Sequence, residues 1–257
     1  MLQALLLSAS LTLSSAPAPA VPARLDAEPL NVEIQTDDDV TLAATYWTPR
    51  EEGERSPAAL LVHDAGESRE QMTEVAERLH RIGFAVLAVD LRGHGGSVTE
   101  DYDWSTLDAD GQERVWAYST RDVEAAASWL RERREVHATN LNLVGVRAGC
   151  ALIVRHAVRD ENVRSLAVIA PTAQVLGFDL TVDIEELAGL PVYLFAPRAR
   201  REAMEAMVTT AHENSGGLEY IELTVQRSRD SDCMEDRKLG TELAKWLKDK
   251  AFPRRGR

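Results

Sequence analysis

Near its beginning, the chain alternates apolar with polar or small residues. The alternation covers Asn31–Gln35 and Val40–Trp47, which are separated by the polar segment Thr36–Asp39. A period of two residues is typical of strands with one buried face. We therefore expect an antiparallel hairpin at the edge of a sheet.

Further along, short apolar runs lack this alternation, as expected for strands that are buried on both faces. They are Ala58–Val62, Ala85–Val89, Leu141–Val146 and Leu166–Ile169. Between them, Arg69–Arg81 and Thr120–Arg134 place apolar residues at helical spacing. Two more units pair strand Val192–Phe195 with helix Arg201–His212 and strand Leu218–Leu223 with helix Glu235–Lys248. This order predicts an α/β fold with a single doubly wound, mostly parallel sheet, and ligands beyond the carboxyl ends of its strands.

The first 30 residues have a different composition. Residues 2–13 are apolar but shorter than the roughly 20 residues that cross a bilayer, and Ala18-Pro19-Ala20 offers the small residues that a signal peptidase recognises. We expect a signal peptide over 1–20, a linker over 21–30, one domain over 31–250 and a frayed basic tail over 251–257. The mature protein is then extracytoplasmic, periplasmic or secreted, with no membrane span. Because no Lys or Arg precedes Arg24, a misassigned start codon or a disordered tail are the alternatives.

Charge and cysteine content exclude several classes of protein. The 257 residues include 29 Lys and Arg against 42 Asp and Glu, a net charge of −13, which argues against nucleic acid as a partner. Two cysteines, Cys150 and Cys233, form neither a disulfide framework nor a structural zinc site. We predict no cofactor.

Three motifs at strand ends resemble those of a known superfamily. They are Leu61–Gly66, Val89–Ser97 and Gly145–Gly149. Together they resemble the α/β-hydrolase fold, and most closely its small dienelactone-hydrolase-like and serine-aminopeptidase-like members, from about Asn31 to Leu247. The resemblance implies a hydrolase architecture, but fold alone does not establish activity.

The catalytic positions that the resemblance implies depart from the family's pattern. The nucleophile lies at the centre of G-x-S-x-G, and Arg147 occupies that position here. The acid follows the strand that ends at Phe195, where the chain reads Ala196-Pro197-Arg198-Ala199-Arg200. The base is a histidine after the last strand, but His212 precedes that strand, and residues 225–235 contain Asp230, Asp232 and Cys233 instead. Three replacements predict that catalysis has been lost.

Other residues of the implied site are retained. Backbone N–H groups of Ala65 and Ala148 match the oxyanion hole, and we expect a ligand site made of Asp64, Ala65, Arg147, Ala148 and Asp232. The Arg147 guanidinium should pair with Asp64 or Asp232, or hold an anionic ligand. Asp64 could instead be a solvated loop acid. His63 and His94 are expected to pack or to form hydrogen bonds rather than to act as bases.

The sequence leaves three functions open. The favoured one is an exported, non-catalytic hydrolase-like protein that binds a small molecule or a protein partner at the former active site. The second is an active hydrolase of esters, lactones or peptides that uses Cys233 or an Asp–water pair. The third is a purely structural role.

Two further features have alternative explanations. Trp104, Trp116 and the acidic stretch Glu100–Asp110 form either a lid or an amphipathic loop that covers the core. Cys150 and Cys233 either meet near the elbow, where an oxidising compartment could join them, or are a buried small residue and an unrelated thiol.

Overall fold

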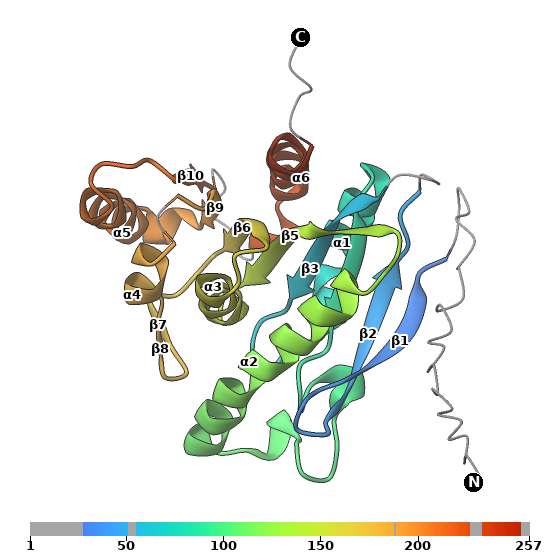
Figure 1. The fold of residues 1–257 in the computed structure, drawn as a ribbon. Coiled ribbons are helices and arrows are strands. Elements are labelled where there is room, and N and C mark those ends of the chain that lie inside the picture. Colours follow the sequence, from blue (N-terminus) through green and yellow to red (C-terminus); the bar gives the residue numbers. More distant parts are fainter. Residues whose placement is uncertain (1–27, 51–54, 188, 227–232, 253–257) are drawn as a thin grey trace, which may run out of the picture.

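Most strands in the described part of the chain form one large sheet. A computed structural model describes residues 28–50, 55–187, 189–226 and 233–252. The sheet strands are β1 (Leu30–Gln35), β2 (Thr41–Trp47), β3 (Ser56–Val62), β4 (Ala85–Val89), β5 (Val136–Val146), β6 (Val163–Ile169), β9 (Val192–Ala196) and β10 (Ile221–Val225). Their order is β1-β2-β4-β3-β5-β6-β9-β10. This mostly parallel, eight-stranded sheet confirms the predicted fold class (Figure 1).

The antiparallel hairpin lies at one edge of the sheet, as predicted. Leu30 pairs with Tyr46 and Gln35 with Thr41, and β2 then pairs antiparallel with β4. In the turn, the Thr36 hydroxyl accepts a hydrogen bond from Val40 N at 2.9 Å, while Thr36 N donates to Val40 O at the same distance. Threonine and aspartate favour such a turn because their side chains bond to nearby backbone.

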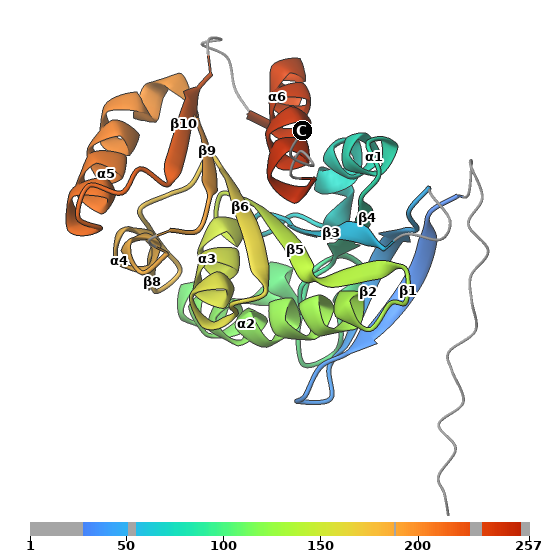
Figure 2. The ribbon, with the colours of Figure 1, turned by 45° about the horizontal axis from the view of Figure 1, so that its top comes forward.

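Helices cover both faces of the sheet. They are α1 (Thr73–Arg81), α2 (Ala109–Arg131), α3 (Gly149–Arg159), α4 (Leu180–Glu185), α5 (Arg201–Asn214) and α6 (Arg237–Ala251). In Figure 2, α1 and α6 lie on one face of the central strands, whereas α2 and α3 lie on the other. The central strands are therefore buried on both faces, which explains their continuous apolar sequences.

Several boundaries differ from the prediction. Helix α2 begins at Ala109, eleven residues before Thr120, because Asp108 caps it by accepting a hydrogen bond from Gly111 N at 2.8 Å. Polar residues around Val115 and Trp116 obscured the helical period of this first half. The helix expected from Arg69 starts with a 3₁₀ turn, Arg69–Met72, and β10 starts three residues after Leu218. Helix α4 and the small hairpin of β7 (Gln174–Val175) and β8 (Phe178–Asp179) are too short to leave a periodic signal.

Three parts of the predicted domain organisation fall mainly outside the described residues. The signal peptide, most of the linker and Arg254, Arg255 and Arg257 of the tail belong to this group. None of the helices within the described ranges is long and apolar enough to span a membrane.

Candidate functional site

Arg147 occupies a sharp turn between β5 and α3. Its φ is +46°, a left-handed value that is unfavourable for a residue with a Cβ atom. A Cβ atom on Gly149 would lie 2.4 Å from the carbonyl oxygen of His63, and one on Gly145 would lie 2.9 Å from Gly149. Only glycine permits these close approaches. The nucleophile elbow is therefore intact in its backbone, with arginine in place of serine.

The Asp64 carboxylate binds the two backbone groups that the resemblance assigns to an oxyanion hole. Its Oδ1 atom accepts hydrogen bonds from Ala65 N at 2.8 Å and from Ala148 N at 3.0 Å. In α/β hydrolases, these two donors, one after the nucleophile and one from the loop after β3, stabilise the oxyanion of the tetrahedral intermediate. A side chain of the protein therefore occupies the predicted hole.

Arg147 and Asp64 form an ion pair across this site. Arg147 Nη1 lies 3.6 Å from Asp64 Oδ2, and the side chains are 47% and 14% exposed. Asp64 is thus one of the two predicted partners of Arg147, while Asp232 lies outside the described residues. The carboxylate is held between a guanidinium and the Ala148 N–H group at the start of α3, both of which favour negative charge.

The backbone around Asp64 is fixed independently of its carboxylate. Asp64 N donates to Gln71 Oε1 at 2.9 Å, and Asp64 O accepts from His63 Nδ1 at 2.7 Å. Gly66 N donates to His94 Nε2 at 3.1 Å. Gln71 could not be predicted from the sequence, since nothing in its local pattern distinguishes it from a surface residue at the start of a helix. These bonds position the loop, so its conformation does not require the Asp64 carboxylate.

His63 and His94 are both committed to backbone groups. The second nitrogen of His63, Nε2, accepts from Leu91 N at 3.1 Å, and His94 Nδ1 lies 2.9 Å from Arg92 O. Burial, with a smaller contribution from His94, lowers the pKa of His63 to about 3. Burial also lowers the pKa of His94. Both histidines connect loops, as predicted, and neither is poised as a base.

We expect the depressed pKa of His63 to make the protein sensitive to acid. An unfolded histidine binds a proton near pH 6.5, whereas folded His63 does so only near pH 3, so the unfolded state binds more protons between these values. Stability should therefore fall as pH decreases from 6.5 towards 3, by up to about 1.4 kcal/mol per pH unit from this residue. Urea unfolding curves at several pH values measure the slope, and His63→Gln should flatten it. A slope unchanged in His63→Gln would assign the acid sensitivity to other groups.

The predicted acid position contains no carboxylate in the structure. Arg198 and Arg200 follow β9 and are both exposed, and Arg200 Nη1 donates to Pro171 O at 2.8 Å and to Thr172 Oγ1 at 2.9 Å. Most of the loop that would carry the base, residues 227–232, lies outside the described ranges. At the position where the family has an acid that orients the catalytic histidine, Arg200 instead binds a backbone carbonyl and a hydroxyl group.

The hypothesis of a Cys150–Cys233 disulfide is wrong in this structure. Both residues are buried thiols. Cys150 donates to Gly145 O at 3.2 Å and belongs to the core packed under α2 and α3, whereas Cys233 contacts Gln226 Oε1 at 3.6 Å within the core under α1 and α6. Because these cores lie on opposite faces of the sheet, the two sulfur atoms cannot meet without rearrangement.

Trp104 and Trp116 pack together instead of closing a lid. Their ring centroids are 5.5 Å apart, and the His94 ring lies 4.7 Å from that of Trp104. Trp116 is fully buried on α2. This cluster covers the core beside the oxyanion loop, which supports the simpler of the two explanations.

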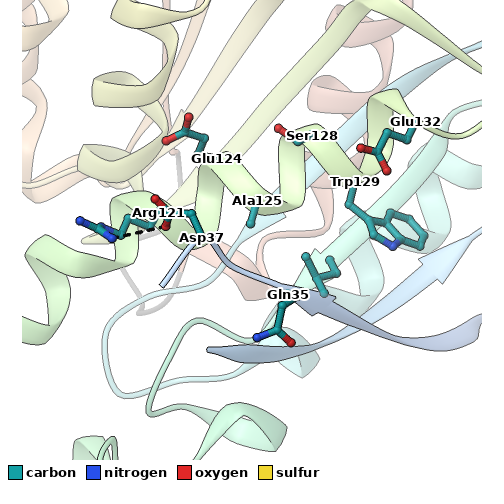
Figure 3. A pocket seen from close by; sticks show the side chains of 9 residues that line it. Gln35, Asp37, Arg121, Glu124, Ala125, Ser128, Trp129 and Glu132 are labelled. Atoms are coloured by element: carbon teal, nitrogen blue, oxygen red, sulfur yellow. Dashed lines mark hydrogen bonds and ion pairs between the residues drawn. The ribbon is translucent and has the colours of Figure 1, made fainter. Parts of the chain in front are cut away.

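A groove of about 400 Å³ lies away from the elbow. It runs between α2 and the end of β1, and Figure 3 shows the Arg121 to Asp37 ion pair at one end and the Trp129 indole towards the other. Helix α2 contributes Glu124, Ser128 and Glu132, and the apolar contribution comes from Ile34, Ala125 and Trp129. Of the predicted site residues that the structure describes, none lines this groove.

Comparisons with known proteins agree with the geometry of the elbow and the sheet. The family model of serine aminopeptidase S33 matches residues 53–213, more than half of the chain. An uncharacterized protein of Mycobacterium tuberculosis is 27% identical over 146 residues, which cover 57% of this chain and 47% of that protein. The chain thus spans about half the length of the curated relatives it matches.

Solved structures share the fold over nearly the whole chain. A Pyrococcus furiosus esterase superimposes with a TM-score of 0.66 at 19% identity, covering 91% of this chain and 94% of the esterase. Dienelactone hydrolase from Anabaena variabilis gives a TM-score of 0.64 at 19% identity, covering 87% and 96%. At these identities the likeness concerns the fold. With the family model, the strand order and the intact elbow together, the chain belongs to the serine aminopeptidase S33 family of the α/β-hydrolase superfamily.

Proposed function

We propose that this protein is an exported, non-catalytic member of its family that binds a small molecule or a protein partner at the former active site. The observation that carries the proposal is the Asp64 Oδ1 atom, which accepts hydrogen bonds from both Ala65 N and Ala148 N. An ester or peptide carbonyl needs these donors in the transition state. A carboxylate already binds these donors, and an arginine occupies the nucleophile position. Both the oxyanion hole and the nucleophile are therefore lost for catalysis.

The alternative of an unusual active hydrolase receives less support. The Cys233 side chain is 2% exposed and packs in the core, so its thiol is shielded from substrate. An Asp–water mechanism would require a carboxylate free to accept a proton from water, whereas one oxygen of Asp64 already binds two N–H groups and the other faces Arg147. A purely structural role is the conclusion if the binding experiments detect no ligand and no partner.

We expect the purified protein to hydrolyse nitrophenyl esters no faster than a heat-unfolded sample, and to resist labelling by a serine-directed fluorophosphonate. The ester series should run from acetate to octanoate, so that it covers both short and long acyl groups. An active serine hydrolase added to the same preparation provides the positive control. Turnover that co-purifies with the protein and follows its concentration would refute the proposal.

Export is tested separately. The predicted signal peptide and the predicted cleavage after Ala20 should produce a mature chain that begins at Val21. Sequencing the N-terminus of the protein recovered from the extracytoplasmic fraction checks this. An intact N-terminus in the cytoplasmic fraction would contradict it.

A further inference from the structure

We propose that the former active site is a receptor for a carboxylate group, and that Asp64 is its built-in competitor. The inference deepens the proposed function, on which it rests, by naming the chemical class of ligand. A carboxylate oxygen already sits at 2.8 Å and 3.0 Å from two backbone donors that belong to distant parts of the chain. The site therefore has the shape and polarity that a carboxylate needs.

Arg147 supplies the charge that selects an anion. Its side chain is 47% exposed, so a ligand in solvent can approach the guanidinium directly. The 3.6 Å separation of Arg147 Nη1 from Asp64 Oδ2 is longer than a charge-assisted hydrogen bond, which usually measures about 2.7–2.9 Å. Because a planar guanidinium carries several N–H donors, it can contact a ligand carboxylate while it remains close to a partner in the protein.

The donors stay in place when the Asp64 side chain leaves. Gln71 holds Asp64 N, His63 holds Asp64 O, and His94 holds Gly66 N, so the loop does not depend on the carboxylate for its conformation. The Ala148 donor is fixed by the elbow, where Arg147 N donates to Ile169 O at 2.9 Å. A preorganised pair of donors binds a replacement acceptor without a cost of reordering the backbone.

Competition between Asp64 and a ligand sets the affinity. Asp64 is tethered beside the hole, so its effective concentration is far above that of a free carboxylate. A ligand enters when the Asp64 side chain, which is already 14% exposed, rotates out of the hole. Removing the carboxylate should therefore tighten binding, which is the opposite of what a residue that contacts the ligand favourably would do.

The test is a thermal titration of the full chain with sodium acetate. Asp64→Ala should show a saturable rise in melting temperature of roughly 2–4 °C, whereas wild type should respond only at much higher concentrations. Sodium chloride at equal ionic strength and acetamide, a neutral molecule of similar shape, should have no such effect. Asp249→Ala, which removes an exposed carboxylate from α6, is the matched control for net charge.

Two further variants separate the donors from the charge. Asp64→Asn keeps an amide oxygen in the hole and should not respond to acetate. Arg147→Gln added to Asp64→Ala should weaken the acetate response at least tenfold. A response of Asp64→Ala no larger than that of Asp249→Ala would overturn the inference.

If Asp64→Ala does not fold, wild type still provides a test. Acetate should shift the amide resonances of Ala65 and Ala148 in a ¹⁵N NMR titration, and unchanged resonances at saturating acetate would overturn the inference. The proposed function fails separately: ester turnover by wild type would refute inactivity without changing the acetate result. A lack of acetate binding would refute the proposed carboxylate receptor without affecting the proposal that the protein is inactive.

Discussion

Replacing Arg92 with alanine is expected to lower the free energy of unfolding by about 3–5 kcal/mol. The Arg92 side chain is fully buried, and its Nη2 atom lies 2.7 Å from Asp122 Oδ1 on α2 and 3.0 Å from Asp38 Oδ1 in the hairpin turn. Asp122 is also fully buried, so the substitution leaves a carboxylate without its counter-charge. Since domains are stable by only about 5–15 kcal/mol, this loss is a large fraction of the total.

The same interactions explain why the hairpin, the loop after β4 and α2 stay together. Arg92 is the largest influence on Asp38 and holds the pKa of that carboxyl well below its ordinary value, whereas burial raises the pKa of Asp122. Arg121 provides a matched control, because its guanidinium is 43% exposed and lies 3.4 Å from Asp37. Arg121→Ala should cost about 0–1 kcal/mol. Unfolding of both variants in guanidinium chloride measures the two losses of stability. Equal losses in the free energy of unfolding would show that burial is not what makes Arg92 costly to remove.

Restoring the serine nucleophile should not restore catalysis. Arg147→Ser, and Asp64→Gly with Arg147→Ser, are both expected to hydrolyse nitrophenyl acetate at the rate of Arg147→Ala. A serine hydrolase that lacks its base loses on the order of 10⁶ in kcat, and the histidines near the elbow, His63 and His94, each contact backbone groups through both ring nitrogens. In the single variant, Asp64 also continues to fill the oxyanion hole.

Comparison with Arg147→Ala isolates the hydroxyl group, because both variants lose the same positive charge. Burst kinetics and fluorophosphonate labelling detect an acyl-enzyme even when turnover is slow. Labelling of the introduced hydroxyl in Arg147→Ser, with turnover above that of Arg147→Ala, would mean that a base other than His63 or His94 reaches the elbow.

Much of the fold could be predicted from residue patterns because periodicity reflects burial. Alternation along β1 and β2 and continuous apolar runs in β3 to β6 each correspond to one or two covered faces. The first half of α2 could not be predicted in this way. Its register is decided by the Asp108 cap and by Trp116, which packs against Trp104 and His94 from other segments. No local pattern carries such long-range contacts.

Residue patterns alone established the superfamily resemblance, the replaced triad positions and the candidate residues Asp64, Ala65, Arg147, Ala148 and Asp232. Asp64 could be a solvated acid, a partner of Arg147 or a ligand contact, and one-dimensional spacing does not distinguish among these roles. The folded chain distinguishes them, because Ala65 N and Ala148 N, 83 residues apart in sequence, converge on one carboxylate oxygen. It also separated Cys150 from Cys233, since the sheet stands between their cores. Hydrogen bonds and packing across distant segments depend on how strands are ordered, which the local sequence does not encode.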